Sequence, residues 1–594
     1  MMQFQGVAHK TALFFQEKQL SDPALWAKFV DLYRSQPDGE NMGWRGEYWG
    51  KMMRGGALVY AYTHNSQLYE ILTDSVRDML TVAELDGRVS TYTKDTEFDG
   101  WDLWSRKYVL LGCEYYLEIC KDEAFKQEII AFLCNCTDYI MESIGPDKRP
   151  ITKASRNWLG INSSSILEPI VRLYKLTGRQ KYLDFAKYII DEGGADGINI
   201  FELAYENKLY PYQYGVPKAY ELISCFEGLL EYYLVTGIEK YKVAVVNFAK
   251  AMLESDISII GCSGITHEML DHTRTRQTVR YDGVMQETCV TVTWMKFCSR
   301  LLELTGESLY ADAMEQSFYN AYLGAVNTED RECAYVKERF PDLAVKATYL
   351  PVDSYSPLTW GTRGRVVGGT QLLPDLSYYG CCACIASAGA GVFLRSAITA
   401  DAEGITVNFF ETGTAELNWQ GSKVTLSVET NYPADGKVKI RVQSEKPASF
   451  TLKVRNPGWS AYPNGYTCHN KVWTDETLEL DFPMPITFHY PIHWEEDVLF
   501  GNTLVCHKPE EDNCIAVTRG PLVLVADTRL GISAEDTFAL THTAEPCMDR
   551  TLGETQCMLK LKFTQKDGTP VCLVDYASAG KDWQSQMAAW LPVR

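Results

Sequence analysis

The sequence predicts a multidomain α+β protein, in which an N-terminal (α/α)6 toroid is followed by one or more antiparallel β-sandwich domains. Three observations predict this fold class. The 594 residues are too many for one ordinary domain, and their hydrophobic content of 46% supplies large cores. A helix–turn–helix pattern recurs through the first 395 residues. After about residue 395, short segments with alternating apolar residues replace it.

The helical pattern has a regular period. Its clearest copies end one helix at Gly178, Gly237 and Gly306, and a second amphipathic helix follows each. Looser copies turn near Asn65 and Asp122, so the turns at 65, 122, 178, 237 and 306 are 57, 56, 59 and 69 residues apart. Glycine ends these helices because it adopts the left-handed conformation without a Cβ penalty. Five hairpins, and a sixth formed by the weaker remaining segments, predict a closed ring. An open solenoid is the alternative, and the lack of polar capping repeats disfavours it.

The C-terminal part has the pattern of antiparallel strands. Period-2 runs separated by Gly, Pro and Asn are typical of a β-sandwich. Five such runs are 424–428, 437–442, 450–454, 478–482 and 515–518. We therefore predict a toroid over residues 1–395, a β-sandwich domain over 396–500, and a second β-rich segment over 501–594 that completes the sandwich region.

Charge and hydropathy exclude several classes of partner. A net charge of −20 without a basic run argues against nucleic acid. No run of 18 apolar residues is present, so we expect no membrane partner. The first residues lack the basic and apolar regions of a signal peptide, and eighteen cysteines in such a chain are typical of reduced thiols. These observations predict a cytoplasmic protein. A homodimer is one assembly that we allow for.

Two short segments concentrate groups that bind soft metals. Glu287 and Cys289 open an apolar helix, and Cys381, Cys382 and Cys384 precede a run of small residues. One carboxylate and several thiols suit a borderline-soft cation, and zinc fits best because hard cations reject sulfur. The alternative is that these are free core cysteines, since Cys is among the most buried residue types.

The same motifs resemble those of glycoside hydrolase family 127, the β-L-arabinofuranosidase family. The resemblance covers nearly the whole chain. It rests on the Glu-Thr-Cys at 287–289, the cysteine cluster at 381–384, the helix through 310–320, the Asn-Pro-Gly-Trp at 456–459 and the Arg-Gly-Pro-Leu-Val at 519–523. That family pairs an (α/α)6 barrel with C-terminal β-sandwich domains, in agreement with the periodicities.

The resemblance implies a metal centre with a sulfur nucleophile. In the family, zinc is held by the Glu, by the Cys two residues later and by two adjacent downstream cysteines, the first of which attacks the sugar. Matching makes Glu287 and Cys289 ligands, Cys381 the nucleophile and Cys382 its neighbour. The motif departs here, because the family usually has the adjacent pair last, followed by proline. Cys382 with Cys384 is therefore a second possible pair.

The resemblance also implies a general acid/base. The family's Glu lies a little over a dozen residues before the Glu-Thr-Cys, which matches Glu268; Asp271 is the alternative. Such a group protonates the glycosidic oxygen and later activates water. His267 beside it is either a substrate contact or a structural histidine.

The sugar pocket departs from the family. Where the family has sugar-binding histidines, this chain reads 105–108 as Ser-Arg-Lys-Tyr, 163–165 as Ser-Ser-Ser and 224–227 as Ser-Cys-Phe-Glu. A site that loses several hydroxyl partners recognises a different hydroxyl pattern. Candidate replacements, which helix capping and core packing explain equally well, are Trp44, Arg45, Glu47, Trp101, Asp102 and His267.

The sequence thus predicts a retaining, zinc-dependent, exo-acting glycoside hydrolase with a cysteine thiolate nucleophile. It resembles a β-L-arabinofuranosidase with an altered sugar pocket, and its partner is an oligosaccharide or glycoside substrate. The alternatives are a non-hydrolytic carbohydrate-binding protein with a structural zinc, or another toroid carbohydrate enzyme such as a lyase or an epimerase.

Overall fold

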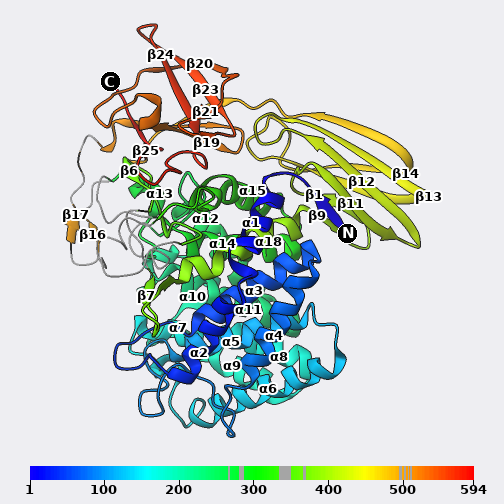
Figure 1. The fold of residues 1–594 in the computed structure, drawn as a ribbon, viewed down its shortest axis with the longest axis vertical. Coiled ribbons are helices and arrows are strands. Elements are labelled where there is room, and N and C mark those ends of the chain that lie inside the picture. The colour runs from blue at the N-terminus through cyan, green and yellow to red at the C-terminus, as the bar shows by residue number, and fades with distance from the viewer. Residues whose placement is uncertain are drawn as a thin grey trace.

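The fold is known from a computed structural model, which describes residues 1–264, 268–279, 286–332, 350–364, 369–493, 498–500, 503–505, 508 and 511–594. Helices occupy the chain up to residue 397 and strands most of the remainder (Figure 1). The predicted combination of a helical toroid with C-terminal antiparallel sheets is confirmed.

Six inner helices form a closed ring, in which each contacts the next and the last contacts the first. In ring order they are α3 (Glu47–Thr63), α5 (Asp102–Leu117), α8 (Leu167–Thr177), α11 (Ala219–Thr236), α14 (Thr288–Thr305) and α18 (Cys381–Ala397). Outer helices pack against them. These are α4 (Ser66–Leu80), α6 (Glu123–Ser143), α9 (Gln180–Asp191), α12 (Glu239–Ser255), α15 (Ser308–Ser317) and α1 (Val7–Phe15), with α2 (Pro23–Ser35) beside α3 and α4.

The sixth hairpin joins the two ends of the toroid. Five hairpins are consecutive in sequence and turn where the periodicity predicted, at α3–α4, α5–α6, α8–α9, α11–α12 and α14–α15. In the sixth, α18 packs against α1, which comes from the other end of the chain (Figure 1). The closure is non-local, and for this reason no sixth repeat is visible in the sequence.

The helix ends have the predicted local causes. Gly178, Gly237 and Gly306 follow the inner helices α8, α11 and α14 in the left-handed region, at φ +64°, +67° and +68°. Asn65 and Asp122 cap α4 and α6, because their side chains accept hydrogen bonds from backbone N–H groups of the first turn.

The first sheet has the strand order β1-β11-β12-β13-β10-β9, with β14 also paired to β13. Its pairs are antiparallel except β10 with β13. The strands are β1 (Met2–Phe4), β9 (Ile398–Ala400), β10 (Gly404–Val407), β11 (Gly413–Trp419), β12 (Ser422–Thr430), β13 (Lys437–Asn456) and β14 (Gly465–Asp481). Alternate residues of β12 and β13 are buried, as the period-2 pattern predicts.

The second sheet has the order β15-β18-β19-β24-β23-β20, with β25, β26 and β6 joined to it. Its strands are β6 (Gly361–Thr362), β15 (Ile486–His489), β18 (Cys514–Arg519), β19 (Leu522–Asp527), β20 (Leu540–Pro546), β23 (Lys560–Gln565), β24 (Pro570–Asp575), β25 (Gln586–Ala588) and β26 (Leu591–Pro592). The predicted division at residue 500 stays a prediction; β15, which precedes that position, pairs with β18 of this sheet.

Two motifs of the sheets fix them to the toroid. Arg455, which is fully buried, forms ion pairs with Asp312 and Glu315 of α15. Asn320 donates a hydrogen bond to the Pro521 carbonyl at 2.9 Å and accepts one from the Val523 amide at 2.8 Å. The 456–459 and 519–523 motifs of the sequence therefore lie at the junctions between helices and sheets.

Candidate metal centre and active site

Four metal-binding side chains meet at one end of the inner helices. Glu287, Cys289, Cys381 and Cys382 each offer one atom, and these atoms all lie within 4.8 Å of one another. All four residues are buried, with Cys381 the most exposed of the three cysteines at 5%, against 0% for Cys289 and 1% for Cys382. The two sequence segments that were predicted to form a centre are thus brought together. We refer to these four residues as the thiol group.

Two short antiparallel strand pairs position the thiol group. Glu287 ends β4 (Gln286–Glu287), which pairs with β5 (Tyr355–Ser356), and α14 begins directly after it. Cys381 begins α18 after a hairpin made by β7 (Thr370–Leu372) and β8 (Tyr378–Gly380). Gly369 before this hairpin must lack a side chain, because a Cβ there would lie 2.1 Å from the Cys381 Sγ. The backbone of this loop therefore covers the sulfur closely.

Helix N-termini favour anions at this position. Cys289 lies in the first turn of α14, and Cys381 and Cys382 open α18. The first turn of a helix presents unpaired N–H groups and the positive end of the helix dipole, and both stabilise a thiolate. Two such ends converge on one set of sulfurs.

The thiol group contains more acid groups than it can ionise without a cation. Burial, with the nearby charges of Glu268 and Cys381, raises the pKa of Glu287 well above its usual range. Hydrogen bonds from Cys289 and Cys382 lower the pKa of Cys381 well below that of a free thiol. Burial raises the pKa of Cys289 and of Cys382 well above the ordinary value. Among the three thiols, Cys381 is therefore the one whose thiolate form its surroundings favour.

The donor set fits zinc. Three sulfurs and one carboxylate are ligands of a borderline-soft cation. The Glu287 Oε1 lies 3.3 Å from the Cys382 Sγ and 3.7 Å from the Cys381 Sγ, while no donor among the described residues reaches its buried Oε2. A buried carboxylate oxygen without a donor is costly, and a metal ion would satisfy it.

Cys384 is not part of the thiol group found among the described residues. It lies one helical turn after Cys381 and is fully buried, and burial raises the pKa of its thiol well above the ordinary value. The geometry thus gives no support to the pair of Cys382 with Cys384, and Cys384 as a ligand remains only a prediction.

Glu268 lies next to the thiol group. It forms an ion pair with Lys218, which precedes α11, and its charge contributes to the raised pKa of Glu287. Its backbone carbonyl accepts a hydrogen bond from the Ala219 amide at 2.8 Å, which ties the segment to the start of an inner helix. His267 lies outside the described residues.

The other predicted pocket residues divide into two kinds. Glu47 is buried beside the thiol group, and burial raises its pKa to about 7. The Trp44 indole donates to the carbonyl of Gly369 at 3.0 Å, and its ring packs edge-on against Trp101. These aromatic rings therefore lie next to the loop that covers Cys381.

Arg45 and Asp102 have internal partners instead. Arg45 forms an ion pair with Asp38 and donates to the Leu372 carbonyl. Asp102 is fully buried, pairs with Arg106 at 3.0 Å and accepts from the Phe98 amide at 2.8 Å. Both side chains hold loops in place, so the capping and packing alternative explains them.

Sequence reasoning missed two lysines and a carboxyl. Lys51 lies 3.0 Å from the Glu47 carboxylate and 3.9 Å from the Cys289 Sγ, and Lys218 pairs with Glu268. Burial raises the pKa of Glu221, in the first turn of α11, to about 7. The one signal in the sequence was that Glu47 and Lys51 lie four residues apart at an otherwise apolar helix start. Charged residues in such a position are buried only when they are paired.

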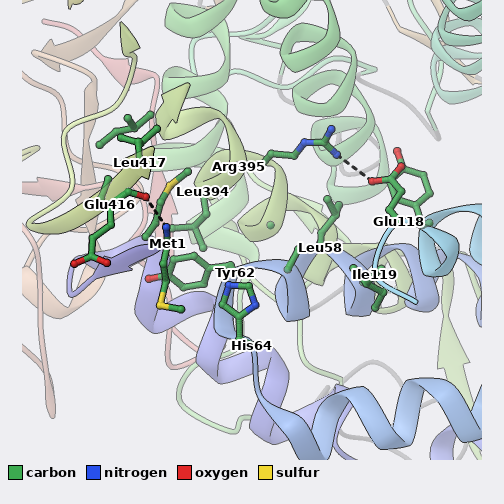
Figure 2. Close-up of a pocket in the computed structure, with 17 residues that line it drawn as sticks. Met1, Leu58, Tyr62, His64, Glu118, Ile119, Leu394, Arg395, Glu416 and Leu417 are labelled. Carbon is green, nitrogen blue, oxygen red and sulfur yellow. Dashed lines mark hydrogen bonds and ion pairs between the residues drawn. The ribbon is translucent and has the colours of Figure 1, made fainter. Parts of the chain in front are cut away.

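One cavity among the described residues lies away from the thiol group. A mainly apolar cavity of about 360 Å³ is lined by Leu58 and Tyr62 of α3, Leu394 of α18, and Leu417 of the first sheet (Figure 2). Leu58 and Leu394 lie toward the C-terminal ends of helices whose N-terminal turns hold Glu47 and Cys381. The cavity is therefore distinct from the thiol group. No helix of the described residues combines the length and apolar character needed to cross a membrane.

The fold and the thiol group define the class of this protein. It is an (α/α)6-toroid protein with β-sheets in its C-terminal part, and four residues that could hold a metal ion lie at the N-terminal ends of α14 and α18. The profile described as "Beta-L-arabinofuranosidase, GH127 catalytic domain" matches residues 9–339, and that of the GH127 middle domain matches residues 404–477. The first match alone covers more than half of the chain. The chain therefore belongs to glycoside hydrolase family 127.

Individual relatives agree with this assignment. The chain is 24% identical over 456 residues to a non-reducing end β-L-arabinofuranosidase of Bifidobacterium longum subsp. longum, which covers 71% of this chain and 64% of that protein. Among solved structures, a GH127 β-L-arabinofuranosidase from Geobacillus stearothermophilus T6 is 17% identical, with a TM-score of 0.74 over 100% of both chains. A GH127 β-arabinofuranosidase is 16% identical, with a TM-score of 0.67 over 100% of this chain and 96% of the other. The solved structures show the shared fold.

Proposed function

We propose that this protein is a retaining, zinc-dependent glycoside hydrolase in which the Cys381 thiolate attacks the sugar. The observation that carries the proposal is the convergence of Glu287, Cys289, Cys381 and Cys382 within 4.8 Å in a chain of this family. The proposed substrate is a glycoside with a β-L-arabinofuranosyl unit at its non-reducing end, because the relative from Bifidobacterium longum is named a non-reducing end β-L-arabinofuranosidase. A cytoplasmic location and the three sequence-predicted domains belong to the same proposal.

Zinc would be held by the same four residues. When bound, it would keep the thiols ionised at neutral pH, where a free cysteine is mostly protonated. The chain itself favours Cys381 as the attacking sulfur. Cys381 is the most exposed of the three, and it opens α18 under the loop that carries Gly369 and the Trp44 indole.

Two steps follow from the arrangement. In the first, the Cys381 Sγ bonds to the anomeric carbon while the glycosidic C–O bond breaks, and Glu268 supplies the proton that the leaving oxygen takes. In the second, water attacks the same carbon, its proton passes to Glu268, and the C–S bond breaks. The ion pair with Lys218 holds the Glu268 carboxyl in place for both transfers.

The sugar pocket supports a changed hydroxyl preference. Aromatic rings of Trp44, Trp101 and Trp104 form a continuous edge-on series, with centroids 6.4 Å and 5.8 Å apart. Such rings can pack on the apolar faces of a sugar. Glu47, which lies beside Cys381, is the carboxylate that we assign to a sugar hydroxyl in a chain that lacks the family's histidines.

A panel of 4-nitrophenyl glycosides tests the proposal, with the β-L-arabinofuranoside beside furanosides and pyranosides of other sugars. We expect release from the arabinofuranoside, loss of activity with a chelator and recovery with zinc. Cys381→Ser is expected to abolish turnover, whereas the matched control Cys384→Ser keeps it. Activity that survives each of Cys381→Ser, Cys382→Ser and Cys384→Ser would refute the thiolate mechanism.

A further inference from the structure

We propose that Lys51 is a positioning residue of the metal centre, which balances part of the centre's negative charge and keeps Cys289 a ligand rather than a nucleophile. The inference rests on the proposed function and deepens it. Lys51 is not part of the motifs by which the chain resembles its family, and it makes no contact with the proposed acid/base among the described residues.

The position of Lys51 is unusual for a lysine. It lies in the second turn of α3 and is 1% exposed. Its Nζ lies 3.0 Å from the Glu47 Oε1 and 3.9 Å from the Cys289 Sγ. The Glu47 carboxylate is itself fixed, because its other oxygen accepts a hydrogen bond from the Trp104 indole. The ammonium is thus held between one carboxylate and one sulfur.

Three aromatic rings complete the surroundings of the ammonium. Its Nζ lies 4.4 Å from the Tyr220 ring centroid, 5.2 Å from that of Tyr108 and 5.7 Å from that of Trp104. The faces of such rings attract cations, most strongly where water is excluded. The ion pair with Glu47 and these rings stabilise a charged ammonium in the core. The geometry therefore puts a cation beside Cys289.

The charge of the thiol group explains why a buried cation belongs there. Four deprotonated ligands around a divalent ion leave two negative charges in a region without water. An ammonium within 4 Å of one ligand offsets part of this excess, as groups that surround a metal site commonly do. Lys51 is the lysine that lies within hydrogen-bond range of a ligand sulfur among the described residues.

The contact also distinguishes the sulfurs. Lys51 approaches Cys289, whereas the Cys381 Sγ has Cys382 at 3.9 Å and Glu287 at 3.7 Å as its neighbours. A charge-assisted hydrogen bond withdraws electron density from the sulfur that accepts it, and this lowers its nucleophilicity. Cys289 is thereby held as a ligand, and Cys381 remains the more reactive sulfur.

Cobalt-substituted protein tests the inference without relying on turnover. Lys51→Met removes the charge and keeps the length of the side chain, whereas Lys51→Arg keeps a cation. Lys296→Met is the matched control, because Lys296 is also buried in the ring and paired with carboxylates, Glu168 and Glu227. Metal affinity is measured by competition with a chromophoric chelator, and the sulfur-to-cobalt charge-transfer band by absorption.

We expect Lys51→Met to weaken metal binding about tenfold or more and to move the charge-transfer band to lower energy. We expect Lys51→Arg to restore most of the affinity and Lys296→Met to leave the band in place. A Lys51→Met protein with wild-type metal affinity and an unmoved charge-transfer band would overturn the inference about Lys51 and leave the proposed function intact. A wild-type chain that takes up no metal would overturn the proposed function and this inference together. If Lys51→Met does not fold by circular dichroism, Lys51→Gln replaces it with the same expected shifts.

Discussion

Two clusters of buried charge share the inner helix α14, and they offset the cost of burial differently. The thiol group gathers acids around Cys289 of α14. Seven residues later, about 10 Å along that helix, Lys296 forms ion pairs with Glu168 at 2.9 Å and Glu227 at 3.1 Å. In this second cluster the protein supplies its own counter-charges. In the first, four acidic groups lie within 4.8 Å of one another, and the contact from Lys51 to Cys289 supplies one positive charge.

The two clusters have different roles in the ring of helices. The cluster around Lys296 contains its own counter-charge, so it holds helices together but does not gain from a further ion. A cluster with excess acid is unfavourable by itself and gains from a bound cation. The two clusters should therefore respond differently to mutation: one through metal and activity, the other through folding.

The largest expected effect concerns the thiol group. Glu287→Gln keeps the size of the side chain but removes the charge of one ligand, so metal binding should weaken and the thiols should reprotonate. We expect a loss of activity on the order of 10⁴-fold, because a protonated thiol is a poor nucleophile. Arabinofuranoside hydrolysis and metal analysis of the same preparation measure it.

Unfolding of Glu287→Gln in urea separates an effect on metal binding from an effect on folding. At pH 4, where the raised pKa keeps the Glu287 carboxyl neutral in the folded protein, the metal-free wild type and the metal-free variant should unfold at nearly equal urea concentrations, because the variant removes no ion pair. A variant that retains a full equivalent of zinc and normal turnover would contradict the assignment of Glu287 as a ligand.

The second prediction concerns the other cluster. Lys296→Met leaves two buried carboxylates without their shared cation, so the free energy of unfolding should fall by about 3–5 kcal/mol. Zinc content should not change. The matched control is Lys175→Met, because Lys175 is 47% exposed in its pair with Glu231; the expected loss there is under about 1 kcal/mol. Equal losses in the two variants would show that burial does not set the value of these ion pairs.

The toroid was predictable from sequence because its signals are local. Gly178, Gly237 and Gly306 mark helix ends through their own backbone preferences, and apolar spacing reports each buried face. The pairing of α18 with α1 was not visible, because it joins segments more than 350 residues apart. A search for repeats compares consecutive segments of the sequence, so it does not detect a contact between the two ends of the toroid.

The same distinction holds for the site. The thiol group was predictable because the Glu-Thr-Cys at 287–289 and the cysteine cluster at 381–384 resemble the family's motifs; the residues alone left free core cysteines as an alternative. Lys51 and Lys218 were not predictable, since a lysine is normally exposed, and only the tertiary structure shows that these two are buried beside acids. Arg45 and Asp102 as sugar contacts stay a prediction, because a charged residue that holds a loop and one that binds a sugar have the same sequence pattern.

The smallest expected effect is a dependence of stability on pH that distinguishes the two clusters. Burial alone would raise the pKa of Glu168, but Lys296 and Arg172 lower it to about 2. A carboxyl with a lowered pKa in the folded state stabilises the protein above its unfolded pKa, near 4.3, and this contribution is lost as the pH falls toward 2. The contribution is about 3 kcal/mol at most. The pKa of Glu227 is raised by burial, so its own protonation works in the opposite direction and reduces the net change.

Urea unfolding of the wild type and Lys296→Met at pH 7, 5, 4 and 3 measures this dependence. Without Lys296, burial should keep Glu168 protonated already near neutral pH, so the variant has little of this contribution to lose on acidification. The stability difference between the two proteins should therefore be largest at pH 5 to 7 and should narrow below pH 4. The thiol group provides the contrast, because burial raises the pKa of Glu287 in the metal-free protein instead of lowering it. The metal-free wild type should lose stability relative to Glu287→Gln as the pH rises above about 4.3, and the two proteins should keep a constant difference below about pH 4. A difference between wild type and Lys296→Met that stays constant from pH 7 to pH 3 would show that Glu168 is not ionised in the folded protein.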